Sequence, residues 1–160
     1  MMDQLLQKFD CDTPHRVQGL FCSIFILQNR LQTACEKVQT DISMKQWLLL
    51  AMLEECPRPK TLTNVGKLMG CSRQNIKKLA AALERKGYLQ LKESANNSLC
   101  LQKTEKVAQY SAQMDERRGM VLQLLFADFS EEEIAQFYSL HGKLYAGMER
   151  VEAYAREVSL

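Results

Sequence analysis

Hydrophobic residues near the start of the chain recur at steps of three and four, which places them on one face of an α-helix. The set begins at Val17 and continues to Val38, and Pro14 stands near the first turn. Proline is tolerated there because the first N–H groups of a helix have no partner within the helix. The pattern predicts one long amphipathic helix that ends before residues 41–43.

A second helix is predicted to begin after Ser43. Ser43 and Gln46 have the spacing of a capping box, in which each side chain bonds the other residue's backbone N–H. Residues 47–53 are apolar almost without interruption, so we expect this helix to be buried on nearly all sides. Two prolines within residues 56–59 end it.

The C-terminal third has a similar pattern, an apolar stripe from Val107 to Leu125 followed by a cap at Ser130 and three acidic residues that match the helix dipole. The next apolar positions keep a strict three-four spacing for more than three heptads, and such a seam usually packs against another helix. The seam consists of Ile134, Phe137, His141, Leu144, Met148, Val151, Ala155 and Val158.

Long apolar helices at both ends of a chain favour a dimerisation layer. The residues predicted to form it are Val17, Leu20, Ile24, Ile134, Phe137, His141, Leu144, Met148 and Val151. Packing of the same seams within one monomer is the alternative. His141 is predicted to be a packed, hydrogen-bonded side chain, with a pH-sensitive role as the competing interpretation.

Residues 62–76 have the pattern of a helix-turn-helix. Thr63 is predicted to cap the first helix, and the small Gly66 allows the second helix to cross it closely. Gly70 suits a left-handed turn position, and Ser72 is predicted to cap the second helix. The apolar side chains of the second helix should face those of the first, namely Ile76, Leu79, Ala80 and Leu83 against Val65, Leu68 and Met69.

The remaining face of the second helix carries the side chains that suit base edges and phosphates. Together with Thr63 and Ser72, the predicted DNA contacts there are Arg73, Gln74, Asn75, Lys77 and Lys78. Charge supports this, because residues 60–106 contain ten Lys/Arg and three Asp/Glu, a net +7, while the whole chain carries only +2. A solvated lysine-rich face is the alternative interpretation of the charge.

After Gly87 the hydrophobic period changes to alternation, at Leu89 and Leu91 and again at Leu99 and Leu101. This predicts a β-hairpin with its turn at the two asparagines 96 and 97. A hairpin directly after a reading helix is a wing, so Lys92, Asn96 and Asn97 are predicted to contact the DNA backbone or minor groove.

The 160 residues are 46% hydrophobic and 25% charged, as expected for a folded domain. We predict a mainly α fold, a winged helix-turn-helix with long dimerisation helices at both ends and one small hairpin. Its parts are residues 1–42 (N-terminal dimerisation), 43–103 (DNA binding) and 104–160 (C-terminal dimerisation). An acidic N-terminus and the absence of a long apolar run predict a cytoplasmic protein without a membrane segment.

Six cysteines occur without a CxxC pair, which favours reduced thiols. Cys71 precedes a predicted helix and Cys11 lies near the chain start, so a redox-sensing role is considered for both, with an inert buried thiol preferred for Cys71. With two histidines, we predict no metal site and no cofactor. The motifs GxGxxG, GxSxG, HExxH and the P-loop are absent, so an enzyme is not expected.

In this order of motifs the chain resembles the MarR family of bacterial regulators, from the helix of Trp47 to Glu105 and Lys106. Residues 72–75 match the start of the family's recognition helix, residues 83–88 its end, and residues 104–106 the start of the helix after the wing. The sequence departs from the family pattern in two places. Residues 94–97 lack the usual Asp and Arg of the wing tip, and Val107 replaces a glycine.

The resemblance implies a homodimer that represses or activates transcription by occupying operator DNA. An unidentified small-molecule effector, or a modification, would change the spacing of the two recognition helices. Two alternatives remain open at this point: a winged-helix module that binds an acidic protein partner, and a cysteine-based redox regulator.

Overall fold

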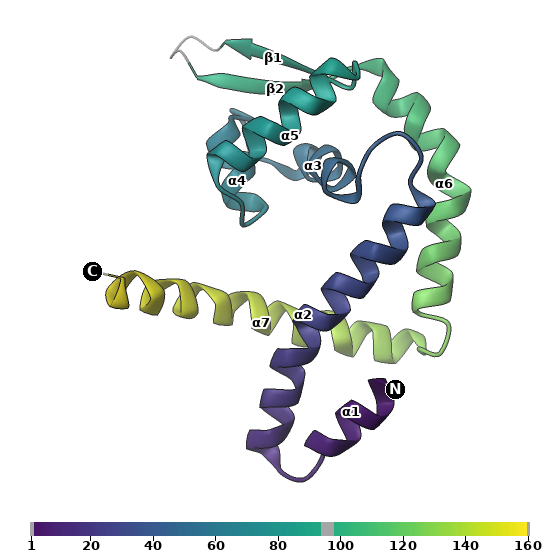
Figure 1. Cartoon of the computed structure of the whole chain (residues 1–160), viewed down its shortest axis with the longest axis vertical. Helices are drawn as coiled ribbons and strands as arrows, with labels where there is room; N and C mark the ends of the chain where they lie inside the picture. The colour runs from purple at the N-terminus through teal and green to yellow at the C-terminus, as the bar shows by residue number, and fades with distance from the viewer. Residues whose placement is uncertain (1, 94–97, 160) are drawn as a thin grey trace. The chain divides into compact units, whose positions relative to one another are not determined.

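The computed structural model describes residues 2–93 and 98–159, with side chains from residue 6 onwards. Two compact units are present, Met1–Arg118 and Gly119–Leu160. Figure 1 shows the helices and the single hairpin. In chain order the elements are α1 (Met2–Phe9), α2 (Thr13–Val38), α3 (Met44–Glu55), α4 (Leu62–Leu68), α5 (Arg73–Arg85), β1 (Leu89–Glu93), β2 (Leu99–Lys103), α6 (Glu105–Leu125) and α7 (Glu131–Val158).

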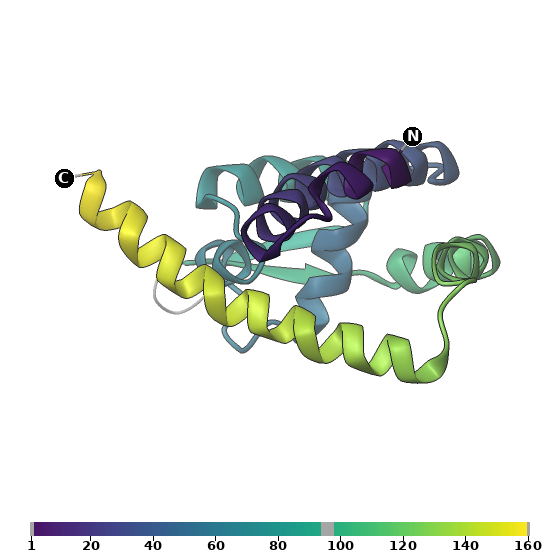
Figure 2. The same cartoon turned by 90° about the horizontal axis from the view of Figure 1, so that it is seen from below.

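The long N-terminal helix is present as predicted, and a short helix α1 that the sequence pattern did not reveal precedes it. Asp12 caps α2 by accepting the backbone N–H of His15, with Pro14 in the first turn. Figures 1 and 2 show α1 beside the beginning of α2. Phe9 packs against the buried Gly19, where an added Cβ would lie 2.7 Å from the Phe9 Cβ. Glycine at this position therefore permits the close approach of the two helices.

Helix α3 has the predicted capping box of Ser43 and Gln46. Its expected burial on nearly all sides is wrong, however. Leu49, Leu50 and Leu53 are buried, whereas Leu48 is 39% exposed and Trp47 is only half-buried. One face of α3, with Leu49, Leu50 and Leu53, enters the core that it shares with α4 and α5.

The core of the first unit joins α3, α4, α5, the hairpin and the beginning of α6. Its buried side chains include Leu49, Leu53, Leu62, Val65, Ile76, Leu83, Tyr88, Leu89, Leu101, Tyr110 and Met114. The core is apolar throughout the described residues, with no charged residue buried in it. Tyr88 and Tyr110 meet edge to face at 5.5 Å between ring centroids, which links the start of the hairpin to α6.

The hairpin is antiparallel, with Leu91 opposite Leu101 and Lys92 opposite Cys100. Thr61 forms a further bridge to Cys100, so the segment before α4 pairs with the second strand. The alternating leucines therefore predicted both strands correctly. The bridge between Thr61 and Cys100 connects the wing to the start of the helix-turn-helix.

The second unit consists of the end of α6 and the 28-residue helix α7. The predicted cap is confirmed, since Ser130 and Glu133 form a complete capping box. Among the described residues of α7 none is buried. None of the helices described is long and apolar enough to cross a membrane.

Candidate nucleic-acid interface

The helix-turn-helix consists of α4, a turn at residues 69–72 and α5. Its first cap differs from the prediction: Thr61, and not Thr63, accepts the backbone N–H of Asn64 at 3.2 Å. The bridge of Thr61 to Cys100 holds Thr61 in extended backbone, which is the conformation that a cap requires. Thr63 lies inside α4 with an exposed side chain, so it remains a predicted DNA contact only.

Two glycines of the helix-turn-helix, Gly66 in α4 and Gly70 in the turn, permit its close packing. Gly70 has φ +61°, in the left-handed region. Gly66 is buried against the turn, and the backbone N–H of Cys71 donates to its carbonyl at 2.8 Å. A Cβ on Gly66 would lie 2.7 Å from the Cys71 carbonyl oxygen, so the missing side chain lets the turn pass close to α4.

Helix α5 begins at the predicted cap, where Ser72 accepts the N–H of Asn75 at 3.2 Å. Ile76, Ala80 and Leu83 are buried, and Leu79 is half-buried against the core. One predicted partner is wrong: Leu68 is 45% exposed and does not belong to the core.

The opposite face of α5 is polar and accessible. The five predicted contact residues of this helix are all exposed, and they are Arg73, Gln74, Asn75, Lys77 and Lys78. Within the described ranges no carboxylate forms an ion pair with any of the three cations in this group. Their charges are thus available to an external polyanion.

Four other lysines of the basic segment have structural partners. Lys60 and Lys103 approach Glu54 at 3.6 and 2.7 Å. The bond and charge of Lys103, ahead of the weaker Lys60 contribution, lower the pKa of Glu54. Glu54 thereby links the end of α3 to β2 and offsets one of the two positive charges of these lysines.

Asp41 plays the corresponding role on the other side of the domain. Lys86 and Lys106 both lie 3.9 Å from its carboxylate, and Tyr88 donates a hydrogen bond to it at 2.6 Å. Lys106 also lies over the Tyr88 ring at 4.4 Å. Burial, followed by the Asp41 hydrogen bond, raises the pKa of Tyr88. Sequence reasoning missed both Asp41 and Glu54, because their partners are distant in the chain.

Of the DNA contacts predicted for the wing, Lys92 lies within the described residues. Lys92 is exposed on β1, and the backbone N–H of the neighbouring Leu91 donates to Glu84 of α5 at 2.8 Å. This bond joins the wing to α5, which lies beside β1 (Figure 1). Asn96 and Asn97, predicted as further contacts, lie outside the described residues, as do positions 94 and 95.

The residues predicted for dimerisation are accessible apolar side chains. On α2 the exposed fractions of Val17, Leu20 and Ile24 are 47–61%. On α7 the corresponding residues Ile134, Phe137, Leu144, Met148 and Val151 are 41–56% exposed. His141 is exposed between the rings of Phe137 and Tyr145, so the expected buried, hydrogen-bonded histidine is not present in this chain by itself.

Two further observations concern groups with unusual surroundings. Arg118 stacks on Trp47 and Tyr110 at 5.2 and 5.4 Å, and its Nε and one Nη have no hydrogen-bond partner among the described residues.

Cys71 is half-buried against the core, as an inert thiol would be, whereas Cys11 is exposed.

A cluster of metal-binding side chains was also missed at the sequence level. Cys11, Asp12 and His15 bring a sulfur, an oxygen and a nitrogen within 4.8 Å of one another. The spacing of Cys11 and His15, one helical turn, was the signal available for it.

No protein-family model and no curated protein matches this sequence. Solved structures match its fold, however. A MarR/EmrR family regulator from Acinetobacter sp. ADP1 is 17% identical with a TM-score of 0.73, covering 83% of this chain and 96% of its own. Staphylococcus aureus MepR, solved in complex with DNA, is 19% identical with a TM-score of 0.62 (82% and 95% covered).

A third similar structure is the PcaV transcriptional regulator of Streptomyces coelicolor, in complex with its natural ligand. It is 19% identical with a TM-score of 0.60, covering 85% of this chain and 93% of its own. The predicted fold is therefore confirmed: the chain has the mainly helical, winged helix-turn-helix fold of MarR-family regulators.

Proposed function

We propose that this chain is a transcription regulator that binds a specific duplex DNA site as a homodimer, with α5 as the reading helix. One observation carries the proposal. The outward face at the start of α5 presents, beside two amides, three cations that form no ion pair with any residue the structure describes, while its inward face is fixed to the core. By contrast, four other lysines of the basic segment have carboxylate partners, at Glu54 and at Asp41.

The roles follow from the chemistry of the side chains. Arg73 suits the paired acceptors of guanine, while Gln74 and Asn75 suit adenine, each by two hydrogen bonds in the major groove. Lys77 and Lys78 would neutralise phosphates, and the Thr63 and Ser72 hydroxyls would bond phosphate oxygens. Lys92 on the wing would contact the backbone or the minor groove beside them.

The dimer is supported by the apolar seams of α2 and α7. An exposed apolar stripe along a helix is costly unless another surface covers it, and in this case a second copy would supply the matching stripe. Dimeric readers of this kind place their two helices in successive major grooves, about 34 Å apart. We therefore expect a pseudo-palindromic operator.

Control by a small-molecule effector is part of the proposal. The DNA-bound protein is expected to repress transcription. PcaV is a structurally similar regulator with a natural ligand bound. Small tilts of the two reading helices are enough to prevent simultaneous binding to both grooves, so a ligand that favours another spacing would release the DNA.

The test is selection of bound fragments from a random duplex library, followed by titration of the selected site and a scrambled duplex at several salt concentrations. A DNA reader should prefer the selected site by a factor of about a thousand or more. Its log affinity should fall linearly with log salt, by about 0.9 for each phosphate contacted. Failure to enrich any sequence would overturn the proposal and favour a winged-helix module with an acidic protein partner.

A further inference from the structure

The loop between α1 and α2 gathers three different metal-binding groups at the surface. The Cys11 thiol, a carboxylate oxygen of Asp12 and one imidazole nitrogen of His15 all lie within 4.8 Å of one another. All three residues are exposed, so an ion can reach them from solvent. They lie far in sequence from α5 and its basic face, and nothing in the DNA-binding proposal uses them.

Local structure explains why the three groups converge. Asp12 is the cap of α2, and one of its oxygens lies 2.9 Å from the His15 backbone nitrogen and 2.7 Å from the ring Nδ1. Cys11 precedes the cap directly, in the turn between α1 and α2 and four residues before His15. The cap thus orients the histidine ring and the carboxylate toward a common point.

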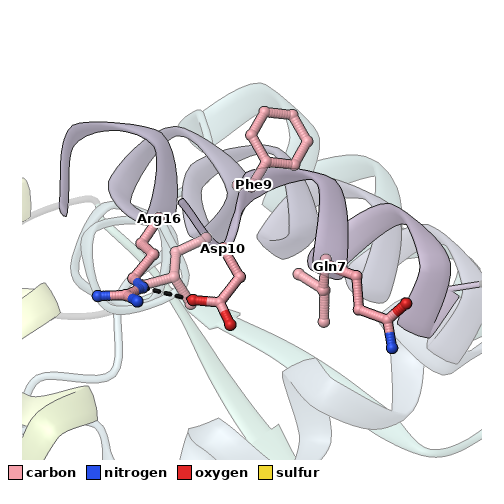
Figure 3. A pocket seen from close by; sticks show the side chains of 7 residues that line it. Gln7, Phe9, Asp10 and Arg16 are labelled. Carbon is pink, nitrogen blue, oxygen red and sulfur yellow. Dashed lines mark hydrogen bonds and ion pairs between the residues drawn. The ribbon is translucent and has the colours of Figure 1, made fainter. Parts of the chain in front are cut away.

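The loop is held on both sides. Arg16 bonds Asp10 at 2.6 Å, a pair drawn with a dashed line in Figure 3. Phe9 packs against Gly19. These contacts fix the end of α1 and the first turns of α2, so Cys11 and Asp12 span a short distance between two anchored helices. A partly preorganised loop loses less conformational entropy when an ion binds.

The donor set indicates the class of ion. A thiolate, an imidazole and a carboxylate together suit Zn²⁺ and its spectroscopic substitute Co²⁺, whereas Mg²⁺ and Ca²⁺ prefer oxygen alone. Bonds of about 2.0 to 2.3 Å in a tetrahedron bring ligand atoms to roughly 3.5 Å from one another. The three side chains, whose ligand atoms lie within 4.8 Å of one another, therefore need only local rearrangement to close the site.

We propose that Cys11, Asp12 and His15 bind one Zn²⁺-type ion per chain, with the fourth position open to water. Binding converts three exposed side chains into a link across the α1–α2 junction. The ion therefore stabilises the packing of α1 on α2, and its affinity is independent of whether the chain binds DNA.

The test uses the untagged full chain under reducing conditions and Co²⁺ as the probe. The wild type is expected to bind one Co²⁺ per chain, with sulfur-to-cobalt charge-transfer absorption that Zn²⁺ abolishes. Cys11→Ser should remove that absorption, and His15→Gln should weaken Co²⁺ binding at least about tenfold. Cys22→Ser and His141→Gln are matched controls, because these residues lie outside the cluster, and both should bind Co²⁺ as the wild type does.

A further variant separates ligation from folding. Asp12→Ser keeps a good helix cap while it removes the carboxylate, so α2 should persist in circular dichroism while Co²⁺ affinity falls. No charge-transfer absorption in the wild type would overturn the proposal. So would Co²⁺ binding that survives Cys11→Ser and His15→Gln together, or binding that either control weakens as strongly as Cys11→Ser does.

Discussion

Gly66 and Cys71 approach so closely that a Cβ on Gly66 would lie 2.7 Å from the Cys71 carbonyl oxygen. The obstacle is backbone, which cannot rotate away as a side chain does. Gly66→Ala is therefore expected to push the turn away from α4 and to lower the free energy of unfolding by about 1 to 3 kcal/mol. Chemical denaturation of the two proteins measures the difference.

Gly119→Ala provides the matched control for Gly66→Ala. Gly119 lies within α6, and an added Cβ would have nothing within 4 Å. Alanine there should stabilise the protein by about 0.4 to 1 kcal/mol, since it restricts the unfolded chain. Equal changes in the free energy of unfolding for the two substitutions would contradict the close approach of the turn to Gly66.

Substitutions on α5 should separate base readers from phosphate binders. Arg73→Ala and Asn75→Ala are each expected to cost about 1 to 3 kcal/mol and to relax preference at particular base pairs. Lys78→Ala should weaken selected and scrambled duplexes alike and reduce the salt slope by about one. Fluorescence anisotropy with systematically altered sites distinguishes these results. A uniform loss for Arg73→Ala on every duplex would show that Arg73 does not read bases.

Ser72→Asp is expected to separate helix capping from DNA binding. Aspartate caps helices as well as serine and suits the helix dipole, so thermal stability should be kept. A negative charge beside the phosphates should nevertheless reduce operator affinity at least about tenfold, the equivalent of about 1.4 kcal/mol. Ser130→Asp makes the same exchange at the cap of α7 and should leave operator affinity unchanged. Unaltered affinity in Ser72→Asp would place the start of α5 away from the DNA.

The Tyr88–Asp41 hydrogen bond should appear in the alkaline stability of the protein. Because the folded-state pKa of Tyr88 is raised, through burial first and Asp41 second, its contribution to stability is complete below about pH 10, where unfolded tyrosine begins to ionise. That contribution is lost as the pH rises further. Tyr88→Phe should cost about 1 kcal/mol at neutral pH and should show a flatter decline in stability above about pH 10.

Urea unfolding on both sides of about pH 10 measures this effect. Tyr138→Phe is the control, because Tyr138 is 82% exposed and should leave the pH dependence as it is in the wild type. A decline in Tyr88→Phe as steep as that of the wild type would contradict the role given to this hydroxyl.

The dimer proposal predicts a strong effect of one charge on the α7 seam. Leu144→Glu would bury a carboxylate in an apolar interface, so light scattering should detect monomers. Operator affinity should fall at least about a hundredfold, since the two reading helices no longer bind as one unit. Lys143→Glu adds an acid at the adjacent position, off the seam, and should remain dimeric. A monomeric wild type, or a dimeric Leu144→Glu, would refute the proposed interface.

The local features of this fold were predictable from the sequence because they depend on residues within about one helical turn of one another. The capping boxes at Ser43 and Ser130, the left-handed Gly70 and the alternating leucines of the hairpin all belong to this class. The exposed face of α5 was predictable for the same reason, since its inward residues recur at helical spacing.

Only the tertiary structure decided which face of α3 is covered, which threonine caps α4 and which lysines remain available to DNA. Leu48 stays exposed because it lies outside the core that α3 shares with α4 and α5, and Thr61 becomes the cap because it pairs with Cys100. Glu54 and Asp41 engage Lys103 and Lys86 across 49 and 45 positions of the chain. Periodicity and capping act over short sequence distances, whereas burial and charge pairing depend on which distant segments meet, and folding alone brings those segments together.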